Sequence, residues 1–528
     1  MNILPYIQRG LLAAGLVVTL SPLHAQQVKL GTPDYVKHKM LTTDIRTSPG
    51  VVGDHYYVIY TDFGVAFGVR RNLDTYIKDY SIKRGHLTKS IYLNPVISPK
   101  DNGVFINHVY LWKDRFLVLF TEKGQSGSQF PVSGQLVDLD GKAVGSPVPL
   151  GFYPHASRAT GLAARAGTFM NGRFILGPLG ALQTAFSSDS ATMAILTAPE
   201  GAKDQGTLVI IDSGLHVVDK LNCDFPIDAN EFQLLQFRQY ASGAMYALIR
   251  EGRTLSRKNA TYDLFRLDTR THRTTRIPLE AHGAIPLDAR IGFDNQGNVL
   301  VTGTYARDAG HGKLTATEGV FAIRVSGTNG LVTGTDVQPF PAELVRNLNS
   351  RRAAAKGKGL DQLIEMRKLV PLAGGGLAAM GQIHFHTVIA QGQTGALNQG
   401  AEEFGDVIYY QVSPEGKILW SSGVEREERN PEMMTTTGPI YLGNAGGCAL
   451  VLYDAEKKDN HYRTAVYQEL YDEKGTPKGG SAVIPWPRHN KSRILWSTAV
   501  PLDEHHVVAS YYSLSDKATG LVTITLAE

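Results

Sequence analysis

Short apolar runs, separated by Gly, Pro, Asp and Asn, recur along the chain from about residue 38 onward. The clearest example is the stretch 402–420, in which one run of alternating polar and apolar residues is followed by Pro414, Gly416 and a second run. Pro fixes φ and Gly tolerates positive φ, so the two together suit a tight turn. Neighbouring side chains of a strand point to opposite faces, so Tyr409 and Tyr410 should face opposite ways. The stretch therefore predicts a strand–turn–strand hairpin.

Similar hairpins form seven or eight groups of about four predicted strands, repeating roughly every 50–60 residues. The first group consists of residues 55–61, 65–69 and 76–82, and residues 186–197 restart the pattern in mid-chain. The last group has only three predicted strands, at residues 492–501, 506–514 and 521–527. The repeat is the property of the sequence on which the fold prediction depends.

Four-stranded sheets repeated around an axis form a β-propeller, which protects the edges of its sheets. We therefore expect an all-β, single-domain propeller of seven or eight blades over residues 26–528. Because the last group lacks a strand, we expect an N-terminal segment, residues 28–30 or 39–45, to complete it and close the ring. The alternative is two or more β-sandwich domains, but no interdomain linker divides the chain.

Three segments interrupt the repeat, near residues 152–183, 341–363 and 387–404. The first contains an Asn-Gly pair that predicts one extra hairpin. The second predicts a short helix over residues 342–348 and carries a basic run. Such a run either contacts an acidic partner or is a solvated connection, and the second interpretation is favoured. The basic run comprises Arg346, Arg351, Arg352, Lys356 and Lys358.

Residues 1–25 have the pattern of a secretory signal peptide. One charge, Arg9, precedes ten apolar residues at 11–20, and a small-residue exit ends at Ala25. An uncleaved anchor is the alternative, but ten residues fall short of the roughly 20 that a membrane span requires. We expect cleavage after Ala25, a periplasmic or secreted location, and no membrane insertion of the mature chain.

Composition and charge exclude some partners. A net charge of +4 in 528 residues is too small to indicate binding to nucleic acid. The two cysteines, Cys223 and Cys448, are far apart in sequence and either form a disulfide in an exported protein or remain as small buried thiols. No cofactor is expected from the motifs present.

Histidines provide the candidate binding residues. His384 and His386 are two residues apart, so on a strand both lie on one face and could bind a metal with a third ligand. His505 and His506 follow Asp503 in a predicted loop. The alternative for both clusters is solvated side chains near a loop mouth. Without a metal, paired histidines could still act as acid and base.

Other chemistry is weakly represented. The sequence contains no G-x-S-x-G, H-E-x-x-H, phosphate-loop or C-x-x-C motif. Residues 413–420 come close to the Asp-box of sialidases, itself a structural turn. Acid clusters at residues 402–406 and 425–428 are expected to be solvated, and calcium-like Asp138 and Asp294 are better explained as turns. Strand tyrosines predict core packing, with a ligand-stacking face as the alternative: Tyr56, Tyr57, Tyr60, Tyr409, Tyr410, Tyr511 and Tyr512.

A series of motifs in order resembles exported, mostly uncharacterised β-propeller-like families of Bacteroidetes. They are FSSD (186–189), EGVFAIRV (318–325), FPAELV (340–345), LAGGGLAAMGQ (372–382), GDVIYYQVSPEGKILWSSGVERE (405–427) and LVLYDAEKKDN (450–460). This chain departs from those families after Trp420, where they often have an Ile-Pro-Lys-like run. The resemblance implies export and a propeller-like ring, and it assigns no activity or functional residue.

The sequence thus predicts a non-catalytic binding or scaffold propeller that recognises a protein, peptide or glycan at one mouth of the ring. The alternative is a polysaccharide-active hydrolase or lyase with a site of histidines and carboxylates at that mouth. The two differ in whether His384, His386, Asp503 and His506 converge with carboxylates in one pocket.

Overall fold

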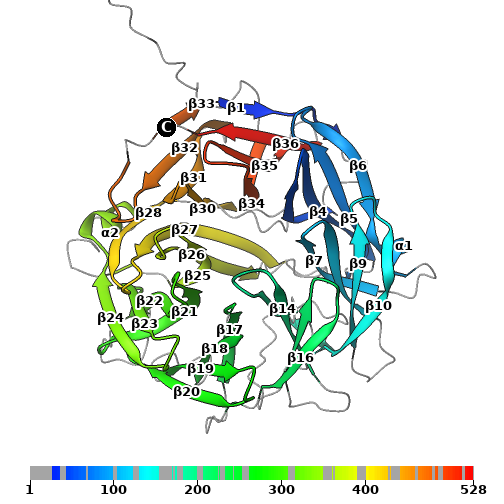
Figure 1. Cartoon of the computed structure of the whole chain (residues 1–528). Coiled ribbons are helices and arrows are strands. Elements are labelled where there is room, and N and C mark those ends of the chain that lie inside the picture. Colours follow the sequence, from blue (N-terminus) through cyan, green and yellow to red (C-terminus); the bar gives the residue numbers. More distant parts are fainter. Residues whose placement is uncertain are drawn as a thin grey trace, which may run out of the picture.

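The computed structural model shows an all-β ring (Figure 1). It describes residues 27–35, 43–66, 69–98, 104–122, 130–153, 169–170, 173–174, 182–198, 206–223, 225, 232–241, 243–251, 261–306, 316–348, 359–360, 363–388, 400–425, 428–429, 440–457, 462–478, 482–485, 492–513 and 518–526. The predicted signal peptide lies outside the described residues, as does most of the predicted insertion at residues 152–183.

The described strands form eight four-stranded antiparallel blades, which confirms the predicted propeller and fixes the blade number at eight. From inner to outer strand, blades 1 and 2 contain β3 (Thr43–Val52), β4 (His55–Ala66), β5 (Val69–Ser81) and β6 (His86–Tyr92), then β7 (Val104–Trp112), β8 (Arg115–Glu122), β9 (Pro131–Asp138) and β10 (Ala143–Phe152). Blades 3 and 4 contain β13 (Thr184–Phe186), β14 (Thr192–Thr197), β15 (Thr207–Asp212) and β16 (Val217–Asn222), then β17 (Phe232–Gln239), β18 (Ala244–Glu251), β19 (Thr261–Asp268) and β20 (Thr274–Leu279).

Blades 5 and 6 contain β21 (Ile285–Phe293), β22 (Val299–Ala306), β23 (Gly319–Val325) and β24 (Val332–Pro339), then β25 (Ile364–Pro371), β26 (Leu377–Val388), β27 (Gly400–Val412) and β28 (Ile418–Val424). Blades 7 and 8 contain β30 (Tyr441–Ala445), β31 (Cys448–Lys457), β32 (Tyr462–Tyr471) and β33 (Ala482–Pro485), then β34 (Ser492–Pro501), β35 (His506–Ser513), β36 (Ala518–Thr525) and β1 (Gln27–Leu30). The remaining elements are β2 (Asp34–Tyr35), β11 (Phe169–Met170), β12 (Arg173–Phe174), β29 (Glu428–Arg429), α1 (Leu93–Ile97) and α2 (Ala342–Leu348).

The core of the molecule lies between the blades. Each of the eight described clusters of buried side chains joins two neighbouring blades, and together the clusters run once around the ring. Strand β27 shows the reason. Tyr409 packs towards blade 7, whereas Tyr410 packs towards blade 5, as the alternation predicts. Both faces of a blade are thus apolar, and each face is buried only by packing against the adjacent blade.

The N-terminal segment closes the ring, as the missing eighth-blade strand predicts. Strand β1 pairs antiparallel with β36 from Gln27↔Thr525 to Leu30↔Val522, and β2 pairs with the other end of β36. The buried side chain of Val28 joins the cluster between blades 7 and 8. The predicted segment 28–30 therefore supplies the closing strand, while residues 43–45 of the alternative segment belong to the inner strand of blade 1.

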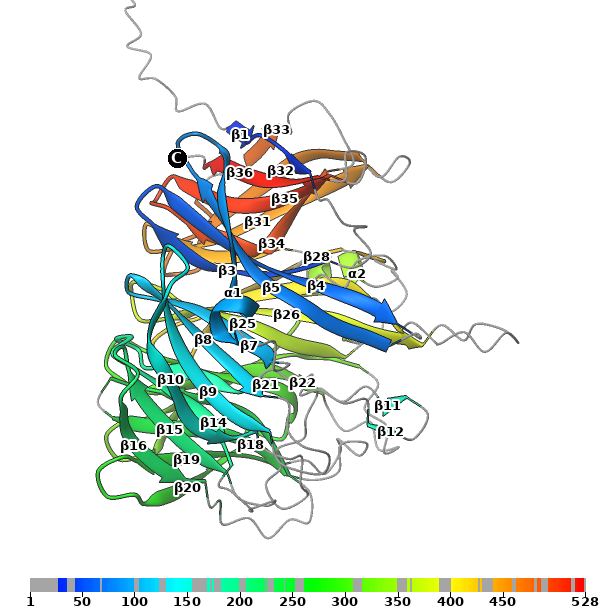
Figure 2. The ribbon, with the colours of Figure 1, turned by 90° about the vertical axis from the view of Figure 1, so that its right-hand side faces the viewer.

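Hairpin turns give the two sides of the ring different characters. Each blade is an antiparallel meander from inner to outer strand, so the turns after its first and third strands share one side, here named the turn face. The connections after the second and fourth strands share the other side, named the loop face. Figure 2 shows the long hairpins β4–β5 and β26–β27 projecting together from the loop face.

One five-residue turn recurs on the turn face. In the turn from Asp294 to Asn298, the Asp294 N–H donates to Asn298 O, and Gly297, at φ 80°, donates its N–H to Asp294 O. The Asp294 side chain accepts two more backbone N–H groups. Within the described residues the same backbone pattern begins at Asp138, Asp212, Tyr240, Asp294, Leu372, Ser413 and Asp472. The interpretation of Asp138 and Asp294 as turn residues is confirmed, as is that of the Asp-box-like stretch as a hairpin.

Several local predictions need correction. Residues 65–69 are not a separate strand, because β4 and β5 run to Ala66 and from Val69 as one long hairpin. The FSSD motif is a turn after the first strand of blade 3, so residues 186–197 are not one strand. Strands β3 and β6 were missed, since β3 contains Pro49 with two register shifts and β6 is mostly polar.

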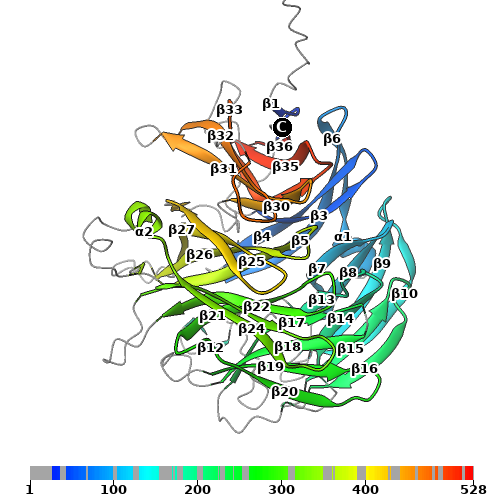
Figure 3. The ribbon, with the colours of Figure 1, turned by 60° about the vertical axis from the view of Figure 1, so that its left-hand side comes forward.

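The helix predicted over residues 342–348 is α2, which packs beside β28 (Figure 1) and lies close to β27 of the same sheet (Figure 3). Helix α1 has no counterpart in the sequence prediction. Residues 351–358 of the basic run lie outside the described residues. Both cysteines are free thiols, in blades 3 and 7. Among the described helices, none is both long and apolar enough to pass through a membrane.

Candidate functional site

The predicted histidines occupy opposite sides of the ring. Asp503, His505 and His506 form the turn between β34 and β35, on the turn face. His384 and His386 lie near the end of β26, opposite Phe404 and Glu402 of β27, on the loop face. Their side chains lie outside the described residues. The structure therefore brings Asp503, His505 and His506 together and separates them from the strand that carries the other pair.

Asp503 organises its turn. Its Oδ1 accepts the His505 N–H at 2.7 Å and contacts His506 Nδ1 at 2.9 Å. Burial raises the pKa of the Asp503 carboxyl, but the hydrogen bonds from His505 and His506 outweigh it and leave the pKa below its usual value. Among the described residues, no three His, Cys, Asp or Glu side chains gather closely enough to hold a metal ion. As a binding site, this cluster stays a prediction.

The tyrosines that the sequence placed in strands are core residues. Tyr56, Tyr57, Tyr60, Tyr409 and Tyr410 are fully buried, and Tyr511 and Tyr512 are nearly so. Burial raises the pKa of the Tyr410 phenol, whose oxygen lies 2.9 Å from the Thr302 hydroxyl across the interface of blades 5 and 6. These rings are accordingly unavailable for stacking on a ligand.

A row of cations on the inner strands is the feature that sequence reasoning missed. The inner strands of neighbouring blades contact one another around the axis. Arg290 of β21 lies four residues before Asp294, the first residue of the turn that follows β21. Lys368 of β25 lies four residues before Leu372, the first residue of the equivalent turn in the next blade. Equal spacing from equivalent turns places the two cations at the same level of the ring.

Arg290 is held by backbone carbonyls on both sides. Its Nε and Nη2 donate to Met366 O of blade 6 at 3.1 and 3.0 Å, and its Nη1 donates to Leu235 O of blade 4 at 3.2 Å. The guanidinium thus spans three inner strands. These contacts fix its position but do not neutralise its charge, since carbonyl oxygens carry only partial charge.

Arg238 and Lys368 flank Arg290. Burial, and then the charge of Arg290, lower the pKa of the half-buried Arg238 guanidinium. Lys368 is exposed to solvent, yet protein surrounds its ammonium closely enough that desolvation lowers its pKa to about 8. Its Nζ lies 4.9 Å from the centre of the Tyr441 ring in blade 7. Lys368 therefore contacts solvent while protein surrounds much of its side chain, as we expect for a residue on an inner strand near the ring axis.

Few acids balance these cations. The described side chains of the inner strands include two acids, Asp288 and Glu365. Asp288 is buried and accepts the Met366 N–H, while Glu365 pairs with Arg367 at 3.4 Å. No carboxylate of the described residues pairs with Arg238, Arg290 or Lys368. The sequence signal was a cation near the end of the first strand in three successive groups, at Arg238, Arg290 and Lys368.

Comparisons with known proteins find only distant structural likenesses, which add no function. No family model matches the chain, and no curated protein matches its sequence. A polysaccharide lyase structure has a TM-score of 0.39 at 10% identity, covering 82% of this chain and 91% of that chain. The β-propeller domain of the Trilobed protease from Pyrococcus furiosus has a TM-score of 0.34 at 9% identity, covering 84% and 95%.

An α-L-arabinofuranosidase of Fusarium graminearum has a TM-score of 0.30 at 8% identity, covering 65% of this chain and 92% of that chain. Likenesses at this level of identity and score carry no argument about activity. The structure of this chain shows a β-propeller of eight blades with three cations on successive inner strands, none of them paired with a described carboxylate.

Proposed function

We propose that this protein is an exported, non-catalytic binding propeller that holds an anionic ligand at the axis of its ring. The observation that carries the proposal is the row of Arg238, Arg290 and Lys368, three cations from successive inner strands that pair with no carboxylate in the part of the chain that the structure describes. A ligand bearing carboxylate or sulfate groups would supply the missing charge. Export rests on the leader pattern at residues 1–25.

The electrostatics favour an anion over a neutral ligand. The like charges of Arg238 and Arg290 repel one another, and the Lys368 ammonium has lost part of its hydration. A bound anion offsets both effects, because opposite charge stabilises the protonated form of each group. Guanidinium groups also bind carboxylate or sulfate through two parallel N–H donors, which adds orientation to attraction.

Calorimetric titration of the mature protein tests the proposal. The probes are an oligogalacturonate, a sulfated oligosaccharide, an oligoglutamate peptide and neutral maltohexaose. We expect the acidic probes to bind and the neutral one not to, with affinity falling as salt screens the charges. Lys368→Gln and Arg238→Gln should each weaken binding about tenfold, since a hydrogen bond to a charged group contributes roughly 1.5–3 kcal/mol.

The matched control is Lys417→Gln, which removes the same charge from an exposed turn of the same blade. It should leave affinity unchanged. Equal affinity for maltohexaose, or an equal loss in the Lys417 variant, would contradict an axial anion site. Release of products from either glycan would instead support the polysaccharide-active alternative.

A further inference from the structure

A cavity of about 400 Å³ opens on the turn face between blades 4 and 5, away from the ring axis. Its volume falls within the roughly 300–1,000 Å³ typical of small-molecule sites. Two blades contribute its wall. Tyr240, Arg266 and Thr269 come from blade 4, while Gln296 and Thr328 come from the turns of blade 5. These five residues contribute one aromatic ring, one guanidinium, two threonine hydroxyls and an amide to the lining.

Arg266 is one of three charged residues that line this cavity, with Asp268 and Arg270. Its Nη1 donates to Thr328 O at 3.0 Å, and no described carboxylate forms an ion pair with it. The nearest acid in the lining, Asp268, uses Oδ1 to accept the N–H groups of Arg270 and Thr271. With Arg270 also in the lining, the cavity keeps an excess of one positive charge.

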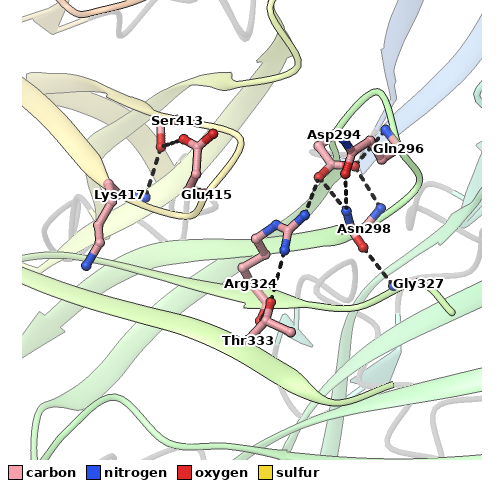
Figure 4. A network of polar contacts seen from close by, with 9 residues as sticks. All are labelled: Asp294, Gln296, Asn298, Arg324, Gly327, Thr333, Ser413, Glu415 and Lys417. Carbon is pink, nitrogen blue, oxygen red and sulfur yellow. Dashed lines mark hydrogen bonds and ion pairs between the residues drawn. The ribbon is translucent and has the colours of Figure 1, made fainter. Parts of the chain in front are cut away.

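The next blade has an arginine at the equivalent position, Arg324, whose charge is balanced by an ion pair. Arg266 and Arg324 each stand two residues before the residue that begins the outer turn, Asp268 and Ser326. Figure 4 shows Arg324 reaching Asp294 and Thr333. Its Nη2 lies 3.3 Å from Asp294 Oδ2, and its Nη1 lies 3.2 Å from Thr333 Oγ1.

Two substitutions between the blades account for the difference. Tyr240 occupies in blade 4 the place that Asp294 occupies in blade 5, because each begins the turn after its first strand. Thr328 likewise corresponds to Glu415, two residues into the outer turn of the following blade. Glu415 is close enough for Arg324 to contribute to the lowering of its pKa, which hydrogen bonding by Ser413 dominates. Arg324 thus has an ion-paired carboxylate, Asp294, and a second one nearby, whereas Arg266 has Asp268 nearby and forms no ion pair with a described carboxylate.

We propose that the Arg266 cavity binds a small acidic sugar, with the sugar carboxylate on the Arg266 guanidinium. The carboxylate replaces the charge that Asp294 and Glu415 provide to Arg324. The hydroxyls of Thr269 and Thr328 and the amide of Gln296 match the ring hydroxyls of a sugar, and Tyr240 is a half-buried ring in the wall. This site is separate from the axial cations, so it goes beyond the proposed function.

Ligand-observed NMR and calorimetry with glucuronate, glucose and glutamate test this site in the mature protein. We expect binding of glucuronate and much weaker binding of glucose. Arg266→Gln should lower glucuronate affinity about tenfold, because a charged hydrogen-bond pair is lost. Tyr240→Asp should lower it similarly, because it gives Arg266 the internal carboxylate that Arg324 already has.

Arg273→Gln is the matched control, since Arg273 is exposed on the same turn but does not line the cavity. It should leave glucuronate affinity unchanged, as should Lys368→Gln at the axis. Thermal melting of each variant establishes that the ring is intact. Equal binding of glucose, preferential binding of glutamate, or unchanged affinity in a folded Arg266→Gln protein would overturn the assignment.

Discussion

At the scale of single residues, Lys368 gives the axial site a pH dependence. Its ammonium has a pKa of about 8, because the surrounding protein disfavours its charge. An anion is attracted to the ammonium and not to the neutral amine. Binding of the acidic probes should therefore be strongest below about pH 7 and weaken as pH rises through the pKa of Lys368. Calorimetry at a series of pH values in one ionic strength measures the effect.

Two variants separate Lys368 from other titrating groups. Lys368→Arg keeps its charge over the whole range, so its affinity should stay level where the wild-type protein weakens. Lys368→Gln should bind weakly at every pH in the series. A wild-type affinity that does not change around pH 8, or the same decline in Lys368→Arg, would remove Lys368 from the site.

At the scale of elements, the recurring turn predicts unequal costs for one substitution in two blades. Asp294 is buried, accepts the N–H groups of Gln296 and Asn298, and also contacts Asn298 Nδ2 and Arg324. Asp294→Ala should cost about 3 kcal/mol of unfolding free energy, because it leaves buried polar groups without partners. Asp472 accepts the backbone N–H groups of Lys474 and Thr476 in its own turn and bonds the Thr476 side chain, but it is not buried and pairs with no arginine among the described residues.

Asp472→Ala should therefore cost clearly less unfolding free energy than Asp294→Ala, because it removes a capping side chain and leaves no buried charge without a partner. Chemical denaturation of both variants compares them in the same turn geometry. Equal losses would mean that the Asp294–Arg324 contact contributes nothing beyond the turn itself.

At the scale of the whole molecule, the ring depends on the contact between its first and last strands. Lys78 of blade 1 is buried and donates to Asp34 of β2 and to Thr519 of β36, with the Tyr60 ring 4.5 Å away. Asp34→Asn should destabilise the protein by about 3 kcal/mol, because it leaves the buried ammonium without a counter-charge. Thermal and chemical unfolding measure the loss.

The exposed pair Lys89–Asp140, which joins blades 1 and 2, provides the comparison. Asp140→Asn should cost clearly less unfolding free energy than Asp34→Asn, since water screens this ion pair. A loss in Asp34→Asn as small as that in Asp140→Asn would show that strand pairing alone, without Lys78, closes the ring.

Local chemistry explains why much of the fold was predictable. Alternation in β27, the turn residues Pro414 and Gly416, and the helical pattern of α2 each depend on neighbours within a few positions. The missing strand of the last group predicted closure, because an open ring would expose β36. Polar or Pro-containing strands such as β3 and β6 escaped the same reasoning, since only pairing with β4 and β5 makes them strands.

The sequence by itself determined the hairpins, their repetition and the need for a closing strand, because these follow from side-chain alternation and turn residues close together in the chain. Only the tertiary structure decided that Arg238, Arg290 and Lys368 lie on neighbouring inner strands, and which arginine forms an ion pair with a described carboxylate. Arg266 and Arg324 occupy equivalent positions before their turns, yet the residues that leave one charged and neutralise the other come from other strands and neighbouring blades. The interaction between two charges depends on their distance in space, and the order of residues along the chain does not specify that distance.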